Sequence, residues 1–153
     1  MPVMRAGKNH HGTALLVGEI GLLVRGASGS GKSLLARLLL ERCRARAQFA
    51  ALISDDQVLL EARGRRLIAR VPDTIEGKME VRGFGIVQVP HEPSARIHGV
   101  IELVTDDDLP RIPNRKLEMI EGVGLPSMQV RGRDLVGALD VADQFIFTLS
   151  TGS

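Results

Sequence analysis

Aromatic and cysteine side chains are scarce in this chain, which has no tryptophan, no tyrosine, four phenylalanines and one cysteine. Proteins that bind RNA or single-stranded DNA stack the bases on aromatic side chains, so this composition disfavours that class. Cys43 has no partner for an internal disulfide, and its place in a predicted helical segment favours a packed thiol over a catalytic one. We therefore expect neither redox chemistry nor a nucleic-acid partner.

Long hydrophobic runs are also missing. No apolar stretch approaches the roughly 20 residues of a membrane span, and residues 1–11 are basic without the apolar core of a secretory signal. We therefore expect a cytoplasmic protein with no membrane partner. The length of 153 residues and the 44% of hydrophobic residues suit one core, so we expect a single domain over residues 1–153.

The net charge is small, +2, but the arginines are unevenly distributed. Such clusters can face nucleic acid. Without aromatic side chains beside them, we favour solvated faces or protein contacts. The two clusters are Arg37, Arg42, Arg44 and Arg46, and Arg63, Arg65, Arg66 and Arg70.

Hydrophobic periodicity predicts a strand, a glycine-rich loop and a helix in succession. Two apolar runs, residues 14–17 and 22–24, are separated by a hairpin signal. The second run leads directly into Gly26, and apolar residues then recur at helical spacing from Lys32 to about Ala47. Beyond this unit we expect strands at 49–53, 57–61, 67–71, 86–89 and 97–104, a loop at 76–85 and a helix at 134–147.

The glycine-rich segment matches the P-loop pattern G-x-x-x-x-G-K-[ST] at every required position. Its glycines let backbone N–H groups turn inward around an anion, and the following helix adds the positive end of its dipole. In such loops the lysine reaches the β- and γ-phosphates of a nucleotide and the final hydroxyl ligates Mg²⁺. The predicted nucleotide-binding residues are Gly26, Ala27, Ser28, Gly29, Ser30, Gly31, Lys32 and Ser33.

An acidic pair, Asp55 and Asp56, follows the next apolar run. We expect that run to be a parallel neighbour of the strand before the P-loop, which would bring the pair to the same crevice as the phosphates. One carboxylate could then face Mg²⁺ while the other accepts the proton of an attacking hydroxyl. The sequence leaves open which of the two is the base.

These motifs resemble the catalytic domain of the HPr kinase/phosphorylase family, whose members phosphorylate a serine of the phosphocarrier HPr and also remove that phosphate. The resemblance covers about residues 10 to 90. It implies an α/β fold, a P-loop nucleotide-binding domain with a central mixed sheet of the HPr kinase/phosphoenolpyruvate carboxykinase type. Besides the P-loop, the matching segments are His11-Gly12, Leu52-Ile53-Ser54-Asp55-Asp56 and Glu80-Val81-Arg82-Gly83-Phe84-Gly85-Ile86.

The resemblance implies a role for each matching residue. Lys32 would bind phosphate, Ser33 and Glu80 would hold Mg²⁺, and Asp56 would be the base with Asp55 beside it. His11 would lie near the acidic pair. Arg111, in Pro110-Arg111-Ile112-Pro113, resembles a family arginine on a flexible loop that stabilises the transferring phosphoryl group. The implied cofactors are ATP and Mg²⁺, the implied partner is HPr, and the implied assembly is a hexamer.

Other features depart from the family's long form. The chain begins directly at the catalytic part, so it looks like the short form found in alphaproteobacteria, without the amino-terminal regulatory domain. Residues 128–134 match poorly the family segment linked to dephosphorylation, so the reverse activity stays open, as does the choice between ATP and pyrophosphate. Two alternatives to a protein serine kinase are a P-loop small-molecule kinase and a non-catalytic, nucleotide-dependent sensor module.

Overall fold

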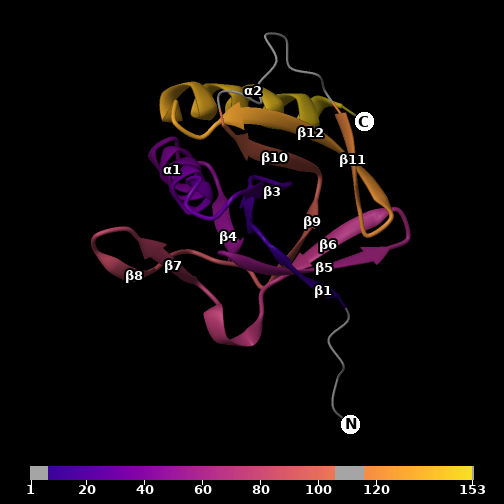
Figure 1. Ribbon diagram of the computed structural model, residues 1–153, viewed down its shortest axis with the longest axis horizontal. Helices are drawn as coiled ribbons and strands as arrows, with labels where there is room; N and C mark the ends of the chain where they lie inside the picture. The colour runs from indigo at the N-terminus through magenta and orange to yellow at the C-terminus, as the bar shows by residue number, and fades with distance from the viewer. Residues whose placement is uncertain (1–6, 106–115, 153) are drawn as a thin grey trace.

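The computed structural model describes residues 7–105 and 116–152. Its centre is a mixed six-stranded sheet with the strand order β11-β12-β10-β3-β2-β4, in which β3, β10 and β12 run parallel (Figure 1). These strands are β2 (Thr13–Val17), β3 (Ile20–Gly26), β4 (Ala50–Ser54), β10 (Gly99–Val104), β11 (Lys116–Ile120) and β12 (Val123–Arg131).

Two helices cover one face of this sheet (Figure 1). They are α1 (Lys32–Ala45) and α2 (Leu135–Thr151). The apolar stripe of α1 buries Leu35, Ala36 and Leu39 against the sheet, as the helical spacing predicts. The N-terminus of α2 is capped by Asp134, whose side chain accepts a hydrogen bond from the amide of Gly137. This cap offsets part of the helix-weakening effect of the glycine.

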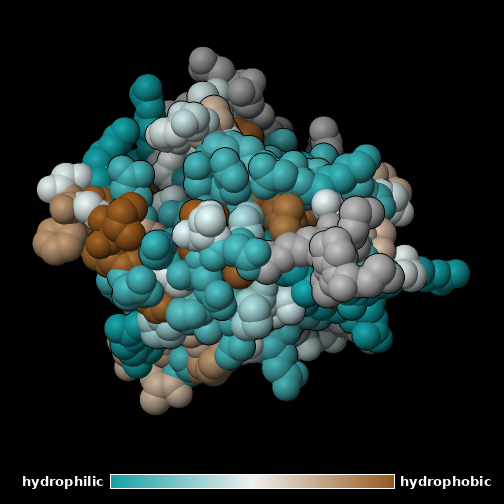
Figure 2. Space-filling model, turned by 90° about the horizontal axis from the view of Figure 1, so that it is seen from below, coloured by the Kyte–Doolittle hydropathy of each residue, from teal (hydrophilic) through white to brown (hydrophobic). Residues whose placement is uncertain are grey.

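A second, antiparallel sheet packs on the opposite face with the order β1-β5-β6-β9. Its strands are β1 (Lys8–His11), β5 (Gln57–Arg63), β6 (Arg66–Arg70) and β9 (Ser94–Ile97). The molecule therefore has three layers and two cores, one between the helices and the central sheet and one between the two sheets. Seen from below, this side is mostly hydrophilic (Figure 2).

The prediction of a loop at 76–85 was wrong in part, because this segment contains the first strand and the turn of a β-hairpin. The hairpin consists of β7 (Lys78–Val81) and β8 (Gly85–Gln88), and it follows a short 3-10 helix, η1 (Asp73–Ile75). Met79 is buried against the helix-side core and anchors it, while Phe84 and Ile86 are exposed. Figure 2 shows hydrophobic side chains gathered on the side where Figure 1 places this hairpin. The glycines and alternating charges of this segment are typical of a loop, and for that reason the sequence did not predict the two strands.

The other predicted elements are present with shifted ends. The strand expected at 97–104 is divided at His98 into β9 and β10, which belong to different sheets. Between the strand expected to end at 104 and the helix expected from 134, where we predicted no element, the chain forms β11 and β12. The last helix extends to Thr151. Among the described residues, none of the helices has the length and apolar character needed to cross a membrane.

The predicted pairing of the strands on either side of α1 was wrong. β3 and β4 point the same way but are not neighbours, because β2 lies between them and pairs antiparallel with both. The tight β2–β3 hairpin places β2 on one side of β3 before the chain crosses over through α1. Because β2 lies between β3 and β4, the acidic residues after β4 are separated from the P-loop by the width of one strand.

Candidate functional site

The P-loop connects the end of β3 to the start of α1. Gly26 has φ 156°, and a Cβ there would lie 2.7 Å from Oγ of Ser30 and 2.9 Å from the carbonyl oxygen of Leu103, so this position requires glycine. Gly31 caps α1 in the left-handed region with φ 102° and supplies no side chain to the first-turn amides. Those amides are thus available to an anion, as the sequence pattern predicts.

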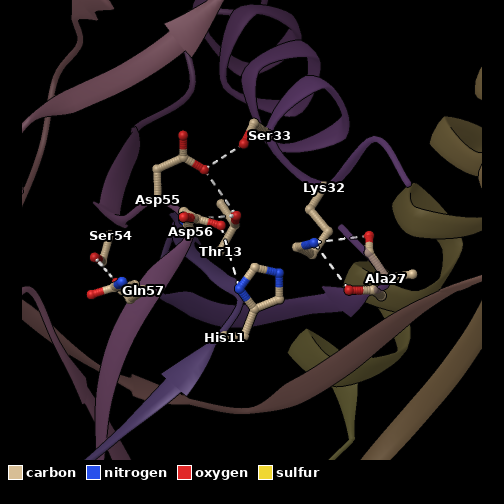
Figure 3. Close-up of polar contacts among 10 residues, drawn as sticks. His11, Thr13, Ala27, Lys32, Ser33, Ser54, Asp55, Asp56 and Gln57 are labelled. Atoms are coloured by element: carbon tan, nitrogen blue, oxygen red, sulfur yellow. Dashed lines mark hydrogen bonds and ion pairs between the residues drawn. The ribbon is translucent and has the colours of Figure 1, made fainter. Parts of the chain in front are cut away.

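Lys32 is a buried cation, and within the described ranges 7–105 and 116–152 it has no anionic partner. Only 6% of the residue is exposed, and its Nζ donates to the carbonyl oxygens of Gly26 at 3.0 Å and Ala27 at 3.1 Å. No carboxylate among the described residues forms an ion pair with it. Figure 3 shows the ammonium pointing at the loop carbonyls and away from Asp55. A buried charge of this kind is favourable only where an anion can join it, so the loop is built for one.

A buried hydroxyl in the same loop also lacks a partner. Oγ of Ser30 has no hydrogen bond to any described residue. Buried polar atoms are nearly always satisfied in the working state of a protein. The Ser30 hydroxyl, the amides at the start of α1 and the Lys32 ammonium together form a set of donors that fits the oxygens of a polyphosphate.

The acidic side of the site is centred on Asp55, which is buried with 8% exposed. Its Oδ1 accepts two hydrogen bonds, from Oγ of Ser33 at 2.6 Å and from Oγ1 of Thr13 at 2.9 Å (Figure 3). Ser33 comes from the first turn of α1 and Thr13 from the start of β2. Two different elements therefore converge on one carboxylate oxygen, and among the described residues Oδ2 of Asp55 has no hydrogen-bond partner.

Asp56 has a different environment from its neighbour. Its side chain is 66% exposed, and its Oδ1 lies 3.4 Å from Nδ1 of His11 on β1. The backbone of Asp56 is left-handed, with φ 69°, a conformation that aspartate tolerates better than most residues. Its carbonyl oxygen accepts from the amide of Gly12 at 2.9 Å, which holds this turn against the start of β2.

The residues present fit a magnesium nucleotide better than a permanently bound metal. Among residues 7–105 and 116–152, no group of three or more histidine, cysteine or acidic side chains could hold a metal ion. Mg²⁺ is often bound by one or two protein ligands together with phosphate oxygens and waters. The Ser33 hydroxyl and the Asp55 carboxylate form such a partial set. Glu80 lies exposed on β7, and among the described residues no hydrogen bond joins it to either of them.

The structure thus brings together four predicted site residues around the P-loop, namely His11, Ser33, Asp55 and Asp56, with Lys32 on the other side of the loop. Arg111 lies outside the described residues. Thr13 was not predicted as a site residue, although a hydroxyl residue directly after His11-Gly12 at the start of a strand was a usable signal. Gly132 was missed as a P-loop neighbour: a Cβ there would lie 2.6 Å from the carbonyl oxygen of Ser30.

Comparisons with known proteins agree with this geometry. The model of the family described as HPr Serine kinase C-terminal domain matches residues 3–132. A protein from Limosilactobacillus reuteri named HPr kinase/phosphorylase is 31% identical over 150 residues, covering 88% of this chain and 45% of the relative. One of the same name from Neisseria meningitidis is 36% identical over 120 residues, covering 69% of this chain and 33% of the relative.

A solved structure has the same fold. The Hpr(Ser) kinase/phosphatase from Coxiella burnetii superimposes with a TM-score of 0.74 at 24% identity, covering 92% of this chain and 98% of that chain. By contrast, this chain spans less than half the length of the two curated relatives. The likeness to the solved structure therefore supports the three-layer architecture described above, and the sequence comparisons support the family.

Proposed function

This chain belongs to the HPr serine kinase C-terminal domain family, and we propose from that membership that it is a protein serine kinase that transfers phosphate from ATP to HPr. The observation that carries the proposal is Lys32, a buried ammonium group that only the two loop carbonyls accompany among the described residues. A phosphate-bearing ligand supplies the anion that this lysine and the start of α1 are arranged to meet.

The two aspartates divide the remaining work. Asp55 is buried and receives the Ser33 hydroxyl, so we assign it to the metal side, where it would hold Mg²⁺ through its water shell. Bound there, Mg²⁺ would neutralise charge on the phosphate oxygens. Asp56 is exposed to an incoming protein, and we assign it as the base.

The proposed reaction moves one proton and one phosphoryl group. The Asp56 carboxylate accepts the proton of the target serine, and the serine oxygen forms a bond to the terminal phosphorus. The bond from that phosphorus to the bridging oxygen breaks, and the nucleoside diphosphate leaves with the electron pair. His11, whose Nδ1 lies 3.4 Å from Oδ1 of Asp56, would orient this carboxylate toward the serine. In the reverse direction Asp56 would return its proton as an acid.

Further assignments come mainly from the family resemblance. Glu80, on the strand β7 that packs against α1 through Met79, would join the metal ligands. Arg111 would stabilise charge on the transferring phosphoryl group. A hexamer, implied by the same resemblance, and a cytoplasmic location complete the proposal. Each is independent of the assignment of the P-loop and the acidic pair.

The proposal is tested by incubating the purified protein with HPr, γ-labelled ATP and Mg²⁺, and locating the label by mass spectrometry. We expect one phosphoserine on HPr, and none when EDTA is present or when that serine is replaced by alanine. A matched reaction with pyrophosphate as donor tests the nucleotide preference. ATP binding without transfer to HPr would overturn the kinase assignment. Transfer to a small hydroxyl compound instead would make the chain a small-molecule kinase.

A further inference from the structure

We propose that Thr13 is a positioning residue that sets the two aspartates in their different roles. The inference rests on the proposed function, since it concerns how the acidic pair serves the metal and the base. Thr13 touches neither substrate nor metal in this proposal. It acts through Asp55 and Asp56, and it does so from a strand that lies between them and the P-loop.

The need for such a residue comes from the sheet order. β2 separates β3 from β4, so the acidic residues after β4 are one strand further from the P-loop than direct neighbours would be. Thr13 is the first residue of β2 and is fully buried. It pairs with Val24 of β3, whose side chain belongs to the helix-side core. Its side chain therefore faces the layer that contains α1, where its hydroxyl and that of Ser33 both reach Oδ1 of Asp55.

A change of register between β2 and β4 brings Asp55 opposite Thr13. Leu15, Leu16 and Val17 pair with Leu52, Ala51 and Ala50, but Ala14 pairs with Ser54. One residue of β4, Ile53, is thus extra. Continuing the unshifted register would place Ser54 opposite Thr13, whereas the shifted register places Asp55 there. β-Bulges of this kind commonly redirect side chains beside active sites.

The Thr13 hydroxyl contacts both members of the acidic pair. It donates to Oδ1 of Asp55 at 2.9 Å and lies 3.5 Å from the amide nitrogen of Asp56, a long contact in which it is the acceptor. A hydroxyl has one proton to donate and lone pairs to accept, so both contacts can exist together. The same atom, Oγ1 of Thr13, therefore contacts both the side chain of Asp55 and the left-handed backbone of Asp56.

Thr13 differs from Ser33, the other donor to Asp55. If Ser33 turns its oxygen toward Mg²⁺, as the proposed function requires, its hydrogen bond to Asp55 changes. Thr13 has no such second task, and its burial excludes water as a substitute donor. We therefore expect Thr13 to hold Oδ1 of Asp55 in place and to leave Oδ2 aimed at the metal water shell.

Two variants separate this role from simple packing. Thr13→Val keeps the shape and the strand preference but removes the hydroxyl, whereas Thr13→Ser keeps the hydroxyl and removes a methyl group. Three quantities are measured: the affinity for a fluorescent ATP analogue in EDTA, the affinity of the protein–nucleotide complex for Mn²⁺ by electron paramagnetic resonance, and turnover on HPr. Thermal unfolding checks that each variant is folded.

We expect Thr13→Val to bind the nucleotide in EDTA within about threefold of the parent, to bind Mn²⁺ about tenfold more weakly, and to turn over ~10- to 100-fold more slowly, the usual effect of losing a group that orients a metal ligand. Thr13→Ser should stay within about threefold in all three measurements. Parental Mn²⁺ affinity in Thr13→Val, or an equal loss in Thr13→Ser, overturns the inference.

The proposed function fails in a different way. If the parent binds Mn²⁺ and nucleotide but does not phosphorylate HPr, the protein substrate is wrong, and a weaker Mn²⁺ affinity in Thr13→Val still supports the positioning role. If the parent binds neither nucleotide nor Mn²⁺, the proposed function and this inference are both overturned.

Discussion

The guanidinium of Arg25 on β3 donates to Oε1 of Glu118 on β11 at 2.9 Å, although β10 and β12 lie between these strands in the sheet order. Arg25 also donates through Nε to Glu102 on β10 at 2.8 Å. Burial alone would lower the pKa of the Arg25 guanidinium, but the hydrogen bonds to Glu102 and Glu118 outweigh it and raise the pKa above its usual value. Because Arg25 directly precedes Gly26, this network ties the edge of the central sheet to the start of the P-loop.

Arg25→Met should lower the free energy of unfolding by about 2 kcal/mol, between the small value of exposed ion pairs and the 3–5 kcal/mol of buried ones. Two neighbouring carboxylates would lose their shared cation. Glu118→Gln is the matched control, because it keeps the shape and an acceptor and should cost less than about 1 kcal/mol. Urea unfolding measures both. Equal losses in the two variants would show that Arg25 does not carry the network.

Lys32→Ala should abolish nucleotide-dependent phosphate transfer while the protein stays folded, because the charge serves phosphate and not the core. Lys32→Met keeps the aliphatic stem and should bind a fluorescent ATP analogue equally poorly. Its free energy of unfolding should equal or exceed that of the parent, since it removes a buried cation that has only carbonyl partners in the part of the chain that the structure describes. Transfer at the parental rate in either variant would contradict the P-loop assignment.

Asp56→Asn should keep MgATP affinity and lose ~100-fold or more in turnover on HPr, the usual contribution of a positioned base. Asp55→Asn is the companion variant and should weaken metal-dependent nucleotide binding, because it removes charge from the buried side of the site. Titration calorimetry with and without Mg²⁺ separates the two effects. The opposite pattern would make Asp55 the base and Asp56 the metal-side residue.

Arg111→Ala should lower turnover on HPr at saturating ATP and leave ATP affinity nearly unchanged, because the proposed charge acts on the transferring group and not on the bound nucleotide. Arg111→Lys tests whether a positive charge suffices. Steady-state kinetics with varied ATP provide the measurement. A tenfold loss of ATP affinity with unchanged turnover would place Arg111 in the nucleotide site instead.

His98 predicts a pH dependence of stability. Its Nδ1 accepts a hydrogen bond from the amide of Gly21 at 3.0 Å, and burial, with a smaller effect of Arg96, lowers the pKa of its imidazole below the usual 6.5. Below pH 6.5 the unfolded chain therefore binds this proton more readily than the folded one, and the free energy of unfolding falls as the pH decreases through the lowered pKa.

The matched control is His98→Asn, which offers an oxygen acceptor near the position of Nδ1 and does not titrate in this range. The difference in unfolding free energy between the parent and this variant, measured by urea unfolding from about pH 7.5 to about pH 5, isolates the histidine. A difference independent of pH would refute the assignment.

Local patterns predicted much of this molecule. The P-loop, the β2–β3 hairpin, α1, the β5–β6 hairpin and α2 could all be identified because their periodicity and turn residues are contained in short windows. The hairpin at β7 and β8 could not, since its stability comes from Met79 packing against residues distant in sequence. The sheet order also escaped, because no local signal states that β2 inserts between β3 and β4.

The site shows the same division. Lys32, Ser33 and the acidic pair were predicted as a group because a motif defines them, and His11 was added through the family resemblance. Thr13 was missed because its role depends on sheet order and on a register shift, which are properties of three strands together. Residues 106–115, with Arg111, lie outside the part of the chain that the structure describes.

The site straddles two layers of the fold. The P-loop and Thr13 belong to the central sheet, His11 belongs to the antiparallel sheet, and the chain crosses from β4 to β5 at Asp55 and Asp56. His11 pairs with Gln57 directly after Asp56, so His11 and the backbone of Asp56 are held by the antiparallel sheet, whereas the side chain of Asp55 is bonded to Thr13 of the central sheet and Ser33 of α1. The residues assigned to the nucleotide and the residue assigned as the base are therefore carried by different layers of the same molecule.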